Sequence, residues 1–118
     1  MERILLIYDC PESPRAAQRI LEAAGYHVTA SSCGHIAMNI IYTARPALVV
    51  LDVCTPGKLI QNLCRQIRDQ SESVPLLVLS FISDVEEVVL LLGLGADDCL
   101  AKPFMPREFL ARARAAMR

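Results

Sequence analysis

The sequence lacks an excess of charge of either sign and lacks any apolar run long enough to span a bilayer. Twelve Lys and Arg residues stand against 13 Asp and Glu residues, so the net charge is −1 with neutral histidines. A charge this close to zero gives no overall argument for binding nucleic acid or an acidic surface. Since no membrane-spanning run and no signal-peptide pattern is found, we expect a cytoplasmic protein with no membrane partner.

The sequence also lacks the cysteine spacing of a disulfide scaffold or a zinc ribbon. The cysteines are odd in number and form no CxxC pair: Cys10, Cys33, Cys54, Cys64 and Cys99. We expect them to be small, buried hydrophobic side chains in a reducing compartment. Cys10, Cys54 and Cys99 fall near the ends of predicted strands, so a thiol metal site or a redox switch is the alternative for these three.

What remains is the composition of one compact domain. The chain has 118 residues, of which 53% are hydrophobic and 21% charged. This length and balance suit a single domain with a real core and argue against disorder. No linker, internal repeat or low-complexity segment is visible. Short apolar runs predict strands over residues 3–8, 26–30, 47–51, 74–79 and 99–101.

Apolar residues at helical spacing predict a helix after each strand. Ser13 and Pro14 are typical of an N-cap and a first helical residue, and Ser83 with Glu86 is typical of a capping box. The predicted helices cover residues 14–24, 36–44, 59–67, 85–92 and 107–117. Strands and helices that alternate in this way predict an α/β fold with a parallel sheet and right-handed crossovers.

Four polar residues end or follow predicted strands: Asp9, Asp52, Ser80 and Lys102. Parallel open sheets bind ligands beyond the carboxyl ends of their strands, so we expect these side chains to converge. Two carboxylates favour a bound Mg²⁺, a lysine can hold a phosphoryl oxygen, and an aspartate can attack phosphorus. The alternatives are capping or loop carboxylates, a turn hydroxyl and a solvated lysine.

Three blocks of sequence carry a resemblance to a known family. LDVCTPG around Asp52, Ser80 after VPLLVL, and GADDCLAKPFMPREFLARARAAMR together resemble the receiver domain of two-component response regulators over essentially the whole length. The last block is especially similar to the OmpR/PhoB-type subfamily, which couples a receiver to a winged-helix DNA-binding domain. The resemblance implies a signalling module, not an enzyme. It also implies one flavodoxin-like (βα)5 domain over residues 1–118, doubly wound with strand order 2-1-3-4-5, as an N-terminal fragment of a longer regulator.

The resemblance implies a role for each residue at the strand ends. Asp52 matches the phosphoacceptor, which takes a phosphoryl group from the phosphohistidine of a sensor histidine kinase. Asp9, Asp52 and the backbone carbonyl of Cys54 match the Mg²⁺ ligands. Ser80 matches the switch hydroxyl, and Lys102 matches the lysine that binds a phosphoryl oxygen. In the family, the peptide bond between this lysine and the following proline is cis. We therefore expect a cis peptide between Lys102 and Pro103.

The chain departs from the family pattern at several positions. Tyr8 stands where the first acidic residue usually lies, so we expect Mg²⁺ binding to be weakened. Cys10 replaces a frequent third acidic residue, and Cys99 replaces the switch aromatic. The pair Leu59-Ile60 replaces a common Asp-Gly.

The predicted fourth helix contains VVLLL, residues 88–92, without a polar residue. Deeper burial of the helix is one interpretation. A hydrophobic self-association surface is the other, since the family dimerises through its fourth helix, fifth strand and fifth helix. The residues that match this interface are Val88, Leu91, Asp97, Asp98, Glu108 and Arg112.

The sequence therefore predicts a receiver that is phosphorylated on Asp52 and controls transcription through a DNA-binding domain outside this chain. The alternative is an atypical receiver that works as a dimerisation or docking module without phosphorylation, which Tyr8, Cys99 and the apolar run VVLLL motivate. A flavodoxin-like nucleotide or flavin carrier shares the topology. Residues 10–14, CPESP, are however a poor phosphate cradle.

Overall fold

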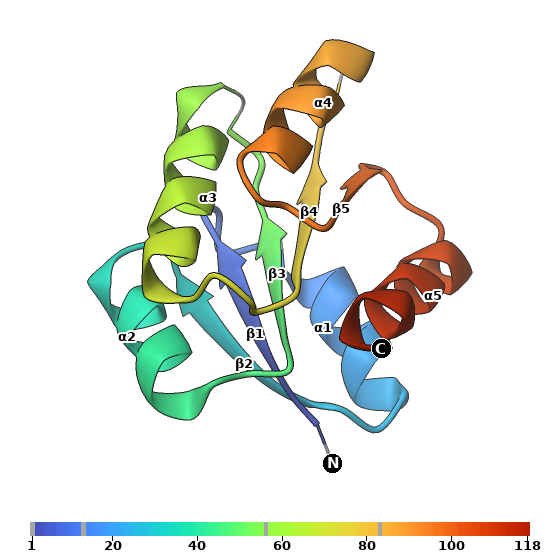
Figure 1. The fold of residues 1–118 in the computed structure, drawn as a ribbon. Helices are drawn as coiled ribbons and strands as arrows, with labels where there is room; N and C mark the ends of the chain where they lie inside the picture. Colours follow the sequence, from blue (N-terminus) through green and yellow to red (C-terminus); the bar gives the residue numbers. More distant parts are fainter. Residues whose placement is uncertain (1, 13, 56, 83) are drawn as a thin grey trace.

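The computed structural model describes residues 2–12, 14–55, 57–82 and 84–118. In these ranges the chain forms one parallel sheet with strand order β2-β1-β3-β4-β5, as predicted (Figure 1). The strands are β1 (Arg3–Tyr8), β2 (His27–Ser32), β3 (Leu48–Asp52), β4 (Leu76–Ser80) and β5 (Asp98–Ala101). The helices are α1 (Arg15–Ala23), α2 (His35–Ala44), α3 (Lys58–Gln70), α4 (Val85–Gly93) and α5 (Pro106–Met117).

The sheet separates two hydrophobic cores because successive strand residues point to opposite faces. In β1, Ile4 and Leu6 face one core, while Leu5 and Ile7 face the other. Helices α1 and α5 cover the first face, and α2, α3 and α4 cover the second (Figure 1). A sheet covered on both sides explains why β3 and β4 are buried at every position.

Backbone pairing, rather than side-chain polarity, sets two strand limits that differ from the prediction. β2 continues past Ala30 because its main chain pairs with β1 as far as Tyr8 and Ser32. β4 begins at Leu76 instead of Val74, since the intervening proline has no N–H to donate to the ladder. Each of these two limits differs by two residues from the prediction, the other strand limits differ by at most one, and the topology is unchanged.

The caps of α1 and α4 are only partly covered by the described residues. Ser13 and Ser83, which the sequence analysis assigns to caps, lie outside them. The structure gives the capping role at α4 to Asp84, whose carboxylate accepts a hydrogen bond of 2.9 Å from the backbone N–H of Glu87. An aspartate here is favourable because it satisfies an orphan donor and sits at the positive end of the helix dipole.

Helix α4 is not buried more deeply than a surface helix, so the first interpretation of its apolar sequence, deeper burial, is wrong. Val85, Val89 and Leu92 are exposed and follow one another at helical spacing. Leu91, in contrast, is 1% exposed and packs into the core against the sheet. The expectation that Leu91 lies on an interface is therefore wrong, because its side chain already faces the core of its own chain.

No helix in the described part of the chain is long and apolar enough to cross a membrane.

Candidate functional site

The parallel sheet brings the four predicted residues to one edge. Asp52 and Ser80 are the last residues of β3 and β4, and Asp9 and Lys102 directly follow β1 and β5. The backbone N–H of Lys102 donates to the carbonyl of Ser80 over 2.8 Å, which fixes the end of β5 against the end of β4. The carboxyl edge of the sheet thus carries two carboxylates, one hydroxyl and one ammonium.

Asp52 is a buried carboxylate held by a lysine. Its residue is 1% exposed, and the Lys102 Nζ forms an ion pair with its Oδ1. The same Nζ donates to the carbonyl of Val53 over 3.1 Å and lies 5.4 Å from the ring centroid of Phe81. Lys102 is therefore not a solvated loop cation, since its charge offsets a buried carboxylate. The peptide between it and the next proline is cis, as predicted.

Asp9 holds the loop that follows β3. Its carboxylate accepts hydrogen bonds from the backbone N–H groups of Cys54, at 2.9 Å, and Thr55, at 2.8 Å. Partial burial raises the pKa of Asp9, but these backbone hydrogen bonds lower it more, so the pKa lies below its usual value. Asp9 is therefore an ionised carboxylate placed beside the Cys54 peptide.

Ser80 carries a hydroxyl that has no hydrogen-bond partner among the described residues. The residue is 1% exposed. Buried polar groups are almost always hydrogen-bonded. The Ser80 hydroxyl is therefore a candidate to bind a ligand at the carboxyl edge of the sheet. A turn hydroxyl, the alternative from the sequence, would bond to its own backbone.

The oxygen donors at this edge fit a magnesium ion. Mg²⁺ prefers carboxylate, carbonyl and water oxygens. The carboxylates of Asp9 and Asp52 end neighbouring strands, and the hydrogen bond between Asp9 and the Cys54 N–H brings the Cys54 peptide alongside. Both carboxylates are engaged by donors of the chain itself, so an ion would replace part of these contacts.

Two thiols accompany these oxygens. One ligand atom from each of Asp9, Cys10 and Cys54 lies within 4.8 Å of the other two. Desolvation, followed by the Cys54 thiol and the charge of Asp9, raises the pKa of Cys10 to about 11. Cys99 is not a member of this cluster within the described residues.

Among the five cysteines, only Cys64 is fully buried, so the expectation of five buried cysteines is wrong for the other four.

Sequence reasoning misses Phe81, which closes the rim over Lys102. Its ring is 57% exposed although it contacts the lysine that holds Asp52. Its position directly after Ser80 is the signal that indicates it. Tyr8, at the end of β1, is half-buried, and its backbone pairs in register with that of Asp52.

The charged residues of the predicted interface pair within the chain. Arg112 donates to Asp98 and to Glu108, each over 2.9 Å. Asp97 accepts hydrogen bonds from the Leu76 N–H, at 2.8 Å, and from Arg68, at 3.2 Å. The first pairs join β5 to α5, whereas Asp97, just before β5, contacts α3 and β4.

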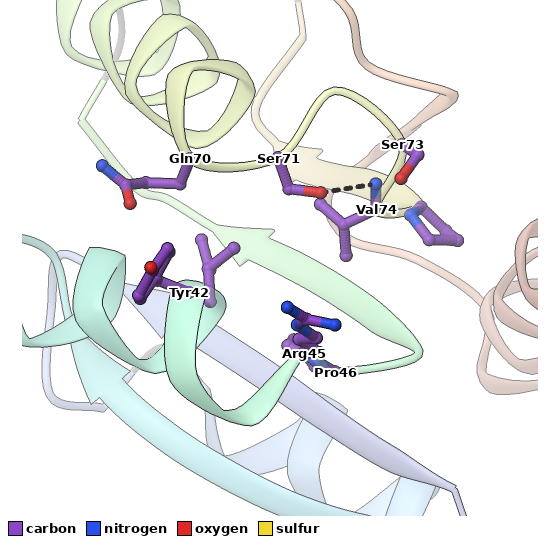
Figure 2. A pocket seen from close by; sticks show the side chains of 9 residues that line it. Tyr42, Arg45, Pro46, Gln70, Ser71, Ser73 and Val74 are labelled. Atoms are coloured by element: carbon purple, nitrogen blue, oxygen red, sulfur yellow. Dashed lines mark hydrogen bonds between the residues drawn. The ribbon is translucent and has the colours of Figure 1, made fainter.

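A separate hollow of about 450 Å³ lies at the opposite, amino edge of the sheet (Figure 2). It opens between the end of α2 and the segment from α3 to β4, where Tyr42, Arg45 and Gln70 surround it. The Ser71 hydroxyl there accepts a hydrogen bond of 3.1 Å from the Val74 N–H. None of the four strand-end residues lines this hollow.

Comparison with known proteins agrees with this geometry. Residues 4–114 match the family described as the response regulator receiver domain. The chain is 37% identical over 117 residues to the DNA-binding response regulator MtrA of Mycolicibacterium smegmatis, covering 99% of this chain and 51% of MtrA. It is 40% identical over 119 residues to the alkaline phosphatase synthesis transcriptional regulatory protein PhoP of Bacillus subtilis, covering 100% of this chain and 50% of PhoP.

The BeF3-activated N-terminal receiver domain of Klebsiella pneumoniae RstA has a similar structure. Its TM-score is 0.85 at 31% identity, with 98% of each chain covered. The present chain spans about half the length of the curated relatives it matches. From the edge residues, the strand order and these matches it follows that the chain belongs to the response regulator receiver domain family, with homologues of the OmpR/PhoB type.

Proposed function

We propose that this receiver is switched by phosphorylation of Asp52. The observation that carries the proposal is the buried Asp52 carboxylate, which pairs with the ammonium of Lys102 at the edge of the sheet where the Ser80 hydroxyl has no partner among the described residues. A carboxylate can be a nucleophile towards phosphorus, and a cation and a hydrogen-bond donor beside it offset the charge that a phosphoryl group adds. The donor is the phosphohistidine of a sensor histidine kinase.

In the proposed transfer each residue has a defined task. An Asp52 carboxylate oxygen bonds to phosphorus while the bond from phosphorus to the histidine nitrogen breaks. The Lys102 Nζ moves from the carboxylate to a phosphoryl oxygen, and the Ser80 hydroxyl donates to another. When bound by Asp9, Asp52 and the Cys54 carbonyl, Mg²⁺ supplies positive charge for the phosphoryl oxygens.

The test is to incubate the chain with a small phosphodonor and Mg²⁺ and to weigh the intact protein. We expect one added phosphoryl group, which Asp52→Asn loses completely because an amide is not a nucleophile. Asp69→Asn is the matched control, because Asp69 is an exposed carboxylate on α3. An adduct that persists in Asp52→Asn would contradict the proposal. No adduct in the parent chain at saturating Mg²⁺ would favour phosphorylation-independent action, which no present finding supports.

Tyr8→Asp is expected to tighten Mg²⁺ binding about tenfold. An added charge about 6 Å from a divalent cation contributes about 1.4 kcal/mol even in a water-like dielectric. Calorimetric titration with Mg²⁺ measures the change. Tyr8→Asn is the control, since it removes the ring without adding charge. If both variants bind Mg²⁺ equally more tightly, the Tyr8 ring, and not the missing carboxylate, is what weakens Mg²⁺ binding.

We further propose that the regulated output is transcription. MtrA is described as DNA-binding and PhoP as a transcriptional regulatory protein, and each is about twice as long as the part matched here. We infer that this chain is the N-terminal receiver of a longer regulator whose effector domain binds DNA. Cytoplasmic localisation remains a prediction that follows from this role.

Self-association through α4, β5 and α5 is the proposed route from the site to the output. Val85, Val89 and Leu92 form an exposed apolar stripe on α4. Val88 is half-buried beside it. The charged residues of β5 and α5, Asp98, Glu108 and Arg112, pair with one another and can exchange their partners with those of a second copy. A hydrophobic centre with a charged rim is the usual anatomy of an interface.

Val89→Glu is expected to abolish the dimer of the phosphorylated chain, because it places a charge where two apolar surfaces would meet. Val89 is 62% exposed, so the substitution costs the monomer little. Sedimentation velocity measures the mass with and without phosphodonor. Ile36→Glu, at a 72% exposed apolar residue of α2, is the control and should leave the dimer intact. If the dimer persists in Val89→Glu, the interface does not include the apolar stripe of α4.

A further inference from the structure

The thiols beside the phosphoacceptor give this edge of the sheet a second donor set. Asp9, Cys10 and Cys54 each offer one ligand atom, and these atoms lie within 4.8 Å of one another. All three residues are half-buried, so a solvent ion can reach them. They come from the loops after β1 and β3, which the hydrogen bonds from Cys54 and Thr55 to the Asp9 carboxylate tie together.

We propose that Asp9, Cys10 and Cys54 bind a thiophilic divalent cation, of which Zn²⁺ is the representative. Two thiolates and one carboxylate are donors that Zn²⁺ accepts readily, whereas Mg²⁺ requires oxygen. Two sulfurs on a tetrahedral Zn²⁺ lie about 3.8 Å apart, given a Zn–S bond of about 2.3 Å. The observed spacing of at most 4.8 Å exceeds this separation by no more than about 1 Å.

Charge at the site is largely compensated when the ion binds. Binding releases the two thiol protons to solvent, since a coordinating thiol is deprotonated. Two thiolates and one carboxylate then face the two positive charges of the ion, which leaves one negative charge. The Lys102 Nζ lies 3.8 Å from the Cys54 Sγ, so its positive charge, which also pairs with Asp52, offsets part of this excess. A fourth coordination position stays open for water.

The two cations would exclude each other because they share a ligand residue on each loop. Asp9 offers its carboxylate in both cases, and Cys54 offers its carbonyl to Mg²⁺ but its sulfur to Zn²⁺. Occupation by the thiophilic ion therefore inhibits phosphorylation of Asp52. This inhibition rests on the proposed function, whereas the binding of the ion does not.

The test uses Cd²⁺ as a probe, since cadmium thiolates absorb in the ultraviolet. The full chain is reduced, freed of metal and titrated. We expect one equivalent to saturate the absorption, Zn²⁺ to compete for it, and excess Mg²⁺ not to remove it. Cys10→Ser and Cys54→Ser should each lower the affinity by at least about tenfold, because even the loss of a residue that only hydrogen-bonds to a metal ligand costs about 10–100-fold. Cys33→Ser and Cys99→Ser are the matched controls and should leave the titration unchanged.

The proposal is overturned if the absorption is missing, if it survives in both Cys10→Ser and Cys54→Ser, or if it depends on Cys33 or Cys99. Thermal unfolding followed by circular dichroism verifies that each variant is folded. Phosphorylation is measured separately, in Mg²⁺ without Zn²⁺, and should proceed in Cys10→Ser. Saturation at one equivalent of Cd²⁺ in a chain that never becomes phosphorylated would support the cation site and reject the proposed function alone.

Discussion

Phe109→Ala is expected to lower the free energy of unfolding by about 3–5 kcal/mol, a large part of the stability of a domain this size. Phe109 is 0% exposed and fills the core between α5 and the sheet, together with Ile4 and Leu6 of β1. Its ring also packs against that of Phe104, with 5.0 Å between centroids. Alanine would leave a cavity that rigid strands cannot close. Urea unfolding followed by circular dichroism measures the loss.

Phe81→Ala is the matched control for this prediction. The Phe81 ring is 57% exposed, so its removal should cost less than about 1 kcal/mol. If the two variants unfold at the same urea concentration, α5 is not docked on the sheet as described. If the free energy of unfolding of Phe109→Ala falls less steeply with urea concentration, the variant exposes less surface when it unfolds.

Arg68→Ala is expected to destabilise the fold by about 2–4 kcal/mol, because one side chain satisfies several main-chain carbonyls. Its guanidinium donates to the carbonyl of Gly95 over 2.6 and 2.9 Å. It also donates to the carbonyls of Ser71 and Val74, at 3.1 and 2.7 Å. Alanine would leave partly buried acceptors without donors before β4 and before β5.

Arg65→Ala and Arg68→Lys separate charge from geometry in the same unfolding measurement. Arg65 is exposed and makes a single 3.3 Å bond to Asn62, so its loss should cost less than about 0.5 kcal/mol. Lysine at position 68 should recover less than half of the effect, since an ammonium cannot reproduce the planar fork. Full recovery with lysine would mean that the charge alone matters.

The strands and their polar ends could be predicted because their signals are local. β3 is apolar at four positions and then reaches Asp52, which is the pattern of a strand buried on both faces with a ligand at its carboxyl end. Strand order is not encoded in periodicity, and only the resemblance to receivers supplied it. The convergence of Asp9, Ser80 and Lys102 follows once parallel pairing is assumed.

The parts that the sequence left open depend on contacts between distant residues. Leu91 and Val89 are both apolar members of one helix, and only the docking angle of α4 decides which is buried. Arg68 and Arg65 are the same residue type on one helix, so the sequence does not distinguish their roles. The role of Arg68 arises because Gly95 approaches it closely: a Cβ at Gly95 would come within 2.8 Å of the arginine side chain. Cys10 and Cys54 are likewise neighbours only after β1 and β3 have paired.

The hydroxyl of Ser80 is buried without a hydrogen-bond partner among the described residues, and this has an energetic consequence. An unsatisfied buried polar group costs roughly 1–3 kcal/mol, and the described residues offer Ser80 no way to recover it. Any state that brings an acceptor oxygen to this hydroxyl regains that energy, which is enough to shift an equilibrium about 5–150-fold. Under the proposed phosphorylation of Asp52, part of the free energy that favours the modified state would therefore come from this hydroxyl, which lacks an acceptor among the described residues of the unmodified chain.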